Sequence, residues 1–253
     1  MRIVVIGGSG LVGSRLVDRL RREGHDVVAA SRSTGVDTMT GDGVARAING
    51  AATVVDVSNP PASGAVAASD FFLASGQRIA AAAQAAGIRH LVVLSVVGAD
   101  RLADGDYFRG KLLQEDLAAR SGIPFTILRA TQFFEFMRTI ADAGSARGFF
   151  HVPDVLVQPA AADDVTAELR RIATAAPLQG TVELAGPEEL PLAEVLRRVL
   201  AAAGDPRPVI ADLDARYFGI PLGVRTLLPG RGARTASTRL DDWLAGSSDR
   251  KVT

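Results

Sequence analysis

The sequence predicts an α/β fold, a doubly wound parallel sheet followed by a smaller C-terminal region. Two observations lead to this fold class. Short runs that are apolar throughout alternate with longer amphipathic segments over the first half of the chain. Such runs are typical of a parallel sheet that helices cover on both faces. Glycine also follows several helical segments, at the position where helices commonly end.

The elements are expected in the following order. Strands are predicted over residues 2–7, 26–31, 52–59, 90–98 and 125–130, with a weak strand at 36–40. Helices are predicted over residues 11–23, 43–50, 70–86 and 107–120. Beyond residue 133 the alternation weakens to a loop or edge strand, a helix capped near Asp163 or Asp164, a strand at 181–186, a helix at 191–204 and a last helical turn anchored by Trp243.

Composition excludes several classes of function. The chain has 253 residues, of which 22% are charged, and its net charge is zero, so no basic surface for nucleic acid or an anionic membrane is expected. It has no cysteine and only three scattered histidines, so we expect no disulfide and no metal site. Because no apolar run reaches the roughly 18 residues of a membrane span and no secretory signal is recognised, we expect a cytoplasmic protein. Its expected partner is a small molecule, and a homo-oligomer is possible.

The segment "IVVIGGSGLVG" predicts a dinucleotide site. Its glycines Gly7, Gly10 and Gly13 lie between an apolar strand and an amphipathic helix. Glycine lets the backbone approach a pyrophosphate closely, and the N–H groups at the helix start attract the anion. The residues expected to hold it are Gly7, Ser9, Gly10, Leu11, Val12 and Gly13. The alternative is a strand-to-helix turn that merely tolerates glycine.

The end of the second strand, "VVAASRS", bears on which dinucleotide binds. NAD recognition favours an acidic residue at this position, and Ser31, Arg32 and Ser33 stand there instead. A guanidinium can pair with a 2′-phosphate, and the serines can add hydrogen bonds. NADP (NADPH) is therefore expected, and NAD is disfavoured. The alternative is an ordinary solvated surface arginine.

The segment "YFRGK" places Tyr107 and Lys111 on one helical face, although the chain has only two tyrosines and two lysines. A nearby ammonium is expected to lower the pKa of the phenol, so that Tyr107 could protonate a carbonyl oxygen as hydride arrives. Lys111 could also hold the nicotinamide ribose. Ser95, at the end of a predicted strand, could bind the same oxygen. The alternatives are an exposed tyrosine beside a solvated lysine, and a serine bonded to its own loop.

Together, "GGSGLVGS", "ASRS", "LSVVGAD", "YFRGKLLQED" and "GIPFTILRATQFFEF" resemble the NmrA-like branch of the atypical short-chain dehydrogenase/reductase superfamily. The resemblance implies a Rossmann fold and a catalytic set of Ser95, Tyr107 and Lys111. It also implies that the loop from Ser58 to Pro60, with Asn59, lies against the cofactor ribose. "VSNPP" replaces the Asn-Ala-Gly stretch found in much of the superfamily, which leaves the proton relay open. Some NmrA-like members bind dinucleotide without turning over a substrate.

The resemblance also implies a division of labour along the chain. Residues 1–150 are expected to form the NAD(P)-binding Rossmann domain, and residues 151–253 to complete the sheet and form a substrate lid. Phe133, Phe134 and Phe136 follow a strand and could form an aromatic wall of the substrate pocket, with His151 near its edge. The alternative for each of these four residues is a structural role.

The resulting hypothesis is an NADPH-dependent oxidoreductase that transfers hydride to a small carbonyl, enone or quinone, with Tyr107 as proton donor. The alternative is a non-catalytic NADP(H)-binding redox sensor of the NmrA type. A nucleotide-sugar epimerase or dehydratase uses the same residue pair, but Arg32 and the small C-terminal region argue against it.

Overall fold

A computed structural model describes residues 1–61, 64, 66–146 and 148–248. The chain forms two compact units. The first unit comprises Met1–Arg129 and Val165–Val182, and the second comprises Ala130–Asp164 and Glu183–Thr253. The chain therefore passes between the units three times. The functional division predicted at residue 150 stays a prediction.

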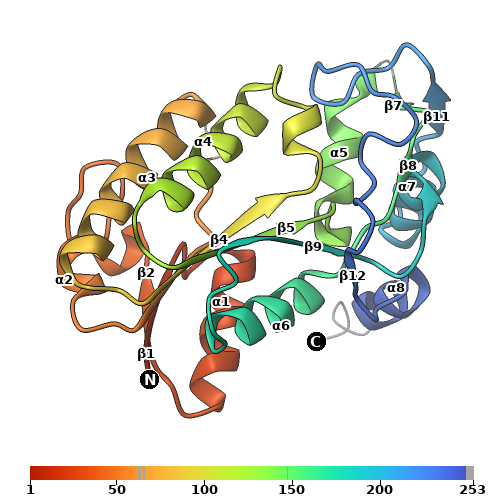
Figure 1. The fold of residues 1–253 in the computed structure, drawn as a ribbon. Coiled ribbons are helices and arrows are strands. Elements are labelled where there is room, and N and C mark those ends of the chain that lie inside the picture. The colour runs from red at the N-terminus through yellow and green to blue at the C-terminus, as the bar shows by residue number, and fades with distance from the viewer. Residues whose placement is uncertain (62–63, 65, 147, 249–253) are drawn as a thin grey trace. The chain divides into compact units, whose positions relative to one another are not determined.

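A seven-stranded sheet has the order β2-β1-β3-β4-β5-β9-β12 (Figure 1). The strands are β1 (Arg2–Ile6), β2 (Asp26–Ala30), β3 (Thr53–Asp56), β4 (His90–Val96), β5 (Phe125–Ala130), β9 (Gly180–Ala185) and β12 (Arg234–Thr235). β1 pairs in parallel with both β2 and β3, and β3 pairs in parallel with β4. This confirms the predicted α/β fold.

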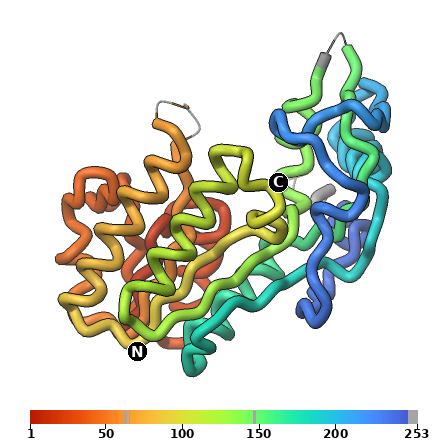
Figure 2. The backbone as a smooth tube through the Cα atoms, turned by 45° about the horizontal axis from the view of Figure 1, so that its top comes forward, coloured from red at the N-terminus to blue at the C-terminus, as the bar shows by residue number. Residues whose placement is uncertain are grey.

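Helices cover both faces of the sheet in the first unit (Figure 1). One face carries α2 (Val44–Ile48), α3 (Ala68–Ala85) and α4 (Asp106–Arg120), and the other carries α1 (Leu11–Arg22) and α6 (Ala162–Ala173). Figure 2 shows α3 and α4 side by side. Every residue of β3 is buried, as expected for a strand between two helical layers.

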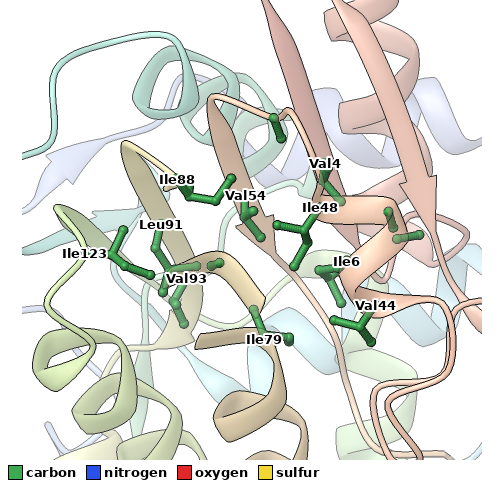
Figure 3. Close-up of a cluster of buried hydrophobic side chains, with 14 of the residues drawn as sticks. Val4, Ile6, Val44, Ile48, Val54, Ile79, Ile88, Leu91, Val93 and Ile123 are labelled. Atoms are coloured by element: carbon green, nitrogen blue, oxygen red, sulfur yellow. The ribbon is translucent and has the colours of Figure 1, made fainter. Parts of the chain in front are cut away.

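The core between the sheet and the layer of α2, α3 and α4 consists of aliphatic side chains (Figure 3). Val4, Val54 and Leu91 occupy paired positions on β1, β3 and β4, and Ile48 and Ile79 reach them from α2 and α3. Each such fully buried side chain contributes roughly 1.5–3 kcal/mol relative to exposure. This core fixes the register of the strands, and hence the positions of the loops that follow them.

Two details differ from the expected elements. Residues 36–40 are not a strand, because the Oδ1 atom of Asp37 accepts hydrogen bonds from the backbone N–H groups of Met39 and Thr40 and closes a turn there. The sixth helix begins at Ala162, so Asp163 and Asp164 lie in its first turn and do not cap it. Its first N–H group donates to the Oε2 atom of Glu135 instead.

Among its described residues, the second unit contains two small sheets and three α-helices. One sheet has the order β11-β7-β6 and the other pairs β10 with β8. The strands are β6 (Ser145–Ala146), β7 (Phe149–Pro153), β8 (Leu156–Val157), β10 (Leu190–Pro191) and β11 (Val209–Asp212), and the helices are α5 (Met137–Ala143), α7 (Leu192–Ala202) and α8 (Leu240–Ser248). The short 3-10 helices of the chain are η1 (Arg32–Thr34), η2 (Ala99–Arg101) and η3 (Phe134–Phe136). Trp243 lies on α8 with its ring 5.3 Å from that of Phe134.

Candidate functional site

The loop between β1 and α1 and the first turn of α1 are packed so tightly that a Cβ on Gly7, Gly8 or Gly13 would collide with backbone atoms. Gly7 has a φ of +81°, and a Cβ there would lie 2.9 Å from the carbonyl oxygen of Val57. A Cβ on Gly13 would lie 2.8 Å from the carbonyl carbon of Gly7 and 2.9 Å from the Cα of Gly8. The first turn of α1 therefore packs directly on the loop that precedes it.

The start of α1 suits an anionic ligand. Gly10 precedes the helix with no side chain to cap it, and the first turn holds no acidic residue. Ser9 and Gly10 are exposed and Leu11 is half-buried, whereas Val12 and Gly13 are buried. The unpaired N–H groups of a helix start carry partial positive charge, so this loop fits the pyrophosphate of a dinucleotide.

The segment after β2 presents hydroxyl groups and a guanidinium to solvent. The Oγ atoms of Ser31 and Ser33 are 2.8 Å apart, and Arg32 is exposed. A Cβ on Gly35 would lie 3.9 Å from an Nη atom of Arg46, so a second guanidinium lies beside this segment. The sequence analysis did not single out Arg46, whose only distinguishing feature in the sequence is its place on the short helix after this segment.

Tyr107 lies in the first turn of α4 and reaches the segment that follows β3. Its hydroxyl donates to the Oδ1 atom of Asn59 over 3.1 Å. Its ring packs edge-on against Phe72, with centroids 5.7 Å apart. Burial raises the pKa of Tyr107 to about 12, so the phenol is protonated at neutral pH.

Lys111 is buried, and its ammonium is held inside the first unit. Its Nζ atom donates to the carbonyl oxygen of Leu94 and to the Oε1 atom of Gln114, each over 3.0 Å, and lies 4.3 Å from the centroid of the Phe72 ring. Burial lowers the pKa of Lys111 to about 8, although the nearby charges of Asp56 and Glu115 oppose this shift. The expected lowering of the phenol pKa is wrong for this structure, because burial of Tyr107 dominates.

Asp56 and Gln114 complete a buried polar chain that the prediction missed. The Nε2 atom of Gln114 donates to the Oδ2 atom of Asp56 over 2.7 Å. The Oδ1 atom of Asp56 accepts the backbone N–H of Ser58 over 3.0 Å. An acid at the end of an apolar strand, and a glutamine one turn after Lys111, were the available signals.

Two serine hydroxyls at the carboxyl ends of neighbouring strands lack partners. Among the described residues, the Oγ atoms of Ser58, after β3, and Ser95, near the end of β4, are buried and make no hydrogen bond. An unpaired buried polar group is costly, and ligands commonly bind beyond the carboxyl ends of parallel strands.

The predicted aromatic wall lies in the second unit. Phe133 and Phe136 stack with centroids 5.6 Å apart, and Phe136 is 43% exposed. Phe134 is buried against Trp243. His151, on β7, is half-exposed, with its Nδ1 atom 3.6 Å from the Oδ2 atom of Asp212.

Gln132, just before these rings, is a residue that the prediction missed. It is buried, and neither its amide nitrogen nor its amide oxygen has a partner among the described residues. The signal in the sequence was a polar residue between Ala130 and two phenylalanines.

A shallow hollow of about 570 Å³ also lies in the second unit, at the end of α7. Its two arginines are engaged, Arg197 with the carbonyl oxygen of Val209 and Arg207 with Asp205.

Comparison with known proteins identifies the family. A family model described as NAD(P)H-binding matches residues 7–144, which include the glycine loop, Ser58, Ser95, Tyr107 and Lys111. The chain belongs to this NAD(P)H-binding family. The match includes the glycine loop and the start of α1, whose geometry fits a pyrophosphate.

Relatives of this NAD(P)H-binding protein include reductases. It is 29% identical over 223 residues, 81% of this chain and 74% of the relative, to the (4-alkanoyl-5-oxo-2,5-dihydrofuran-3-yl)methyl phosphate reductase of Streptomyces griseus subsp. griseus. Its fold is similar to MoeE5 in complex with UDP-glucose and NAD, with a TM-score of 0.75, 20% identity and complete coverage of both chains. It is also similar to the NADPH-dependent quinone oxidoreductase QOR2 of Escherichia coli, with a TM-score of 0.65 and 17% identity over 98% of this chain and 99% of the other.

Together the family and the fold define an NAD(P)H-dependent oxidoreductase with the Rossmann architecture of the short-chain dehydrogenase/reductase superfamily. In the described part of the chain, no helix is both long enough and apolar enough to cross a membrane. The described residues also contain no group of three or more histidines and acids that could hold a metal ion.

Proposed function

We propose that the protein is an NADPH-dependent reductase of a small carbonyl, enone or quinone compound, and that Tyr107 donates the proton. The observation that carries this proposal is the protonated phenol of Tyr107, hydrogen bonded to Asn59 beyond the carboxyl end of β3. The substrate class is supported by the relatives, one of which reduces a 5-oxo-2,5-dihydrofuran compound and one a quinone.

In this proposal each residue has a separate task. The bound dinucleotide supplies the hydride. Tyr107 gives its proton to the substrate oxygen, and the hydroxyl of Ser95 donates a hydrogen bond to the same oxygen after rotating outward. Asn59 holds the phenol through the 3.1 Å hydrogen bond until substrate binds, and the O–H then turns from the Asn59 Oδ1 atom to the substrate oxygen. Lys111, the third member of the predicted set, holds Leu94 and Gln114 and so fixes the face of α4 that carries Tyr107.

The preference for NADPH rests on the segment after β2. Arg32 and the hydroxyls of Ser31 and Ser33 stand where an acidic residue would bind the ribose of NAD. Arg46 adds a second positive charge beside Gly35. We expect Arg32→Ala to weaken NADPH binding about tenfold or more and to leave NADH binding nearly unchanged, since paired guanidinium–phosphate bonds are worth roughly 1.5–3 kcal/mol. Equal losses for both coenzymes would contradict the NADPH assignment.

The role of Tyr107 is tested by oxidation of NADPH against a panel of quinones, enones and aromatic carbonyls. Tyr107→Phe is expected to lower turnover at least a hundredfold while NADPH affinity stays unchanged, because general acids typically contribute 10²–10⁴-fold. Tyr217→Phe, at the only other tyrosine, is the matched control and is expected to retain activity. Full activity of Tyr107→Phe would refute the proton-donor role.

A non-catalytic redox sensor is the second candidate. It is favoured by the hydrogen bonds that engage both the Tyr107 hydroxyl and the Lys111 ammonium with protein groups. Tight NADPH binding, measured by calorimetry, with no oxidation across the whole panel would favour the sensor over the reductase.

A further inference from the structure

A single helix, α4, holds the segment after β3 at two places. Tyr107 and Gln114 lie seven residues apart on α4, and Lys111 lies between them on the same face. Tyr107 is hydrogen bonded to Asn59, and Gln114 is hydrogen bonded to Asp56, which precedes Asn59 by three residues. Between these contacts, the Ser58 N–H returns to the Asp56 carboxylate and closes a turn.

The two oxygens of the Asp56 carboxylate have different tasks. Oδ1 sets the turn through the Ser58 N–H, and Oδ2 is anchored to α4 by the 2.7 Å bond from Gln114. Without the anchor, the carboxylate would be free to rotate about its side-chain bonds, and the turn would lose its fixed acceptor. The geometry of residues 56–59 therefore depends on Gln114.

The orientation of the Gln114 amide is dictated by the charges on either side of it. Its oxygen accepts from the Lys111 ammonium, and its nitrogen donates to the Asp56 carboxylate. In the reverse orientation the amide N–H groups would face the ammonium and the amide oxygen would face the carboxylate. Glu115 lies next on α4, but Arg129 binds it through two hydrogen bonds. Beside Gln114 and Asp56 lies a small cavity, which is otherwise lined by apolar residues of α3, β4 and α4: Gly76, Ile79, Ala80, Leu91, Val93, Leu117 and Ala118.

We propose that Gln114 is a positioning residue, which couples Lys111 to Asp56 and so holds the Ser58–Asn59 turn on which Tyr107 depends. Its importance for turnover rests on the proposed function. The hold on the turn itself does not, because it can be measured without a substrate.

The test uses amide hydrogen exchange at Ser58, whose N–H donates to Asp56. Gln114→Leu removes both hydrogen bonds and is expected to lower the protection of Ser58 at least tenfold at every pH. Gln114→Glu is the conservative rescue. A protonated carboxyl at position 114 can accept from Lys111 and donate to Asp56 as the amide does, whereas an ionised one repels Asp56. This variant is therefore expected to keep the protection of Ser58 in acid and lose it as pH rises.

Thr126→Val is the matched control, since it also removes buried hydrogen bonds in the first unit, those of Thr126 with His90 and Leu178. It is expected to leave the protection of Ser58 unchanged relative to other amides. A second readout is the ionisation of Tyr107 by ultraviolet absorbance in a Tyr217→Phe background, which leaves one tyrosine. Loosening of the turn by Gln114→Leu is expected to let water reach the phenol and to shift this titration toward lower pH, because burial is the main cause of the raised pKa of Tyr107.

Unchanged protection of Ser58 in Gln114→Leu would overturn the proposal, and so would a Gln114→Glu variant whose protection does not depend on pH. If Gln114→Leu fails to fold, the pH dependence of Gln114→Glu decides alone. If no compound of the substrate panel is reduced but the Gln114 variants change the protection of Ser58 as expected, the proposed reductase is refuted and the role of Gln114 in holding the turn is not.

Discussion

The contact between α1 and the glycine loop makes Gly13→Ala a direct perturbation of the proposed dinucleotide site. The new Cβ would overlap the carbonyl oxygen of Gly7 and would lie 2.8 Å from its carbonyl carbon, where ordinary contact begins at 3.4 Å, so relieving the second contact alone needs a shift of at least 0.6 Å (3.4 − 2.8). The obstacle is backbone and cannot swing aside. Overpacking of this kind costs about 1–3 kcal/mol, which exceeds the gain of at most about 1 kcal/mol from replacing a helical glycine.

We therefore expect Gly13→Ala to lower the free energy of unfolding by about 1–2 kcal/mol and to weaken NADPH binding at least tenfold, since the displaced N–H groups no longer match the pyrophosphate. Urea unfolding and calorimetric titration measure the two effects. Gly246→Ala is the matched control, because Gly246 lies in helix α8 with open space around it, so this variant is expected to be as stable as the parent or more stable. Gly13→Ala with control-like stability and unchanged NADPH affinity would refute the reasoning.

Two further predictions concern buried polar groups. Lys111 has a pKa of about 8 in the folded protein, whereas its reference value is 10.5. Between about pH 8 and pH 10.5 the unfolded chain therefore binds more protons than the folded one, and the free energy of unfolding rises with pH. From about pH 7.5 to about pH 9.5 the free energy of unfolding should gain roughly 2 kcal/mol from this group, and urea titrations of Lys111→Met should lack that gain. Gln132→Leu should raise the free energy of unfolding by about 1–2 kcal/mol, because it removes two unpaired buried groups. Gln158→Leu is the control: it removes a 2.7 Å hydrogen bond to the carbonyl oxygen of Gly186 and should lower the free energy of unfolding. If Gln132→Leu also lowers the free energy of unfolding, the Gln132 amide has hydrogen-bond partners and the prediction is wrong.

Local patterns were sufficient to predict the strand, glycine loop and helix that are proposed to hold the dinucleotide. An apolar strand, three spaced glycines and an amphipathic helix are contiguous, so the sequence alone located β1, the loop and α1 to within a residue. The alternation of apolar runs likewise predicted the parallel sheet. The absence of an acid after β2 was equally visible, because it depends only on where one strand ends.

The sequence by itself determined the fold class, the glycine loop with its flanking strand and helix, and the helix that carries Tyr107 and Lys111. Only the tertiary structure decided what the side chains of that helix touch: Gln114 bonds Asp56, which is 58 residues away in the chain, and Lys111 bonds a carbonyl of β4. The spacing of Tyr107 and Lys111 predicted an ammonium acting on a phenol, but burial moved their two pKa values in opposite directions. Backbone periodicity is set by neighbouring residues, whereas the partner and the solvation of a buried polar group are set by whatever the fold packs against it.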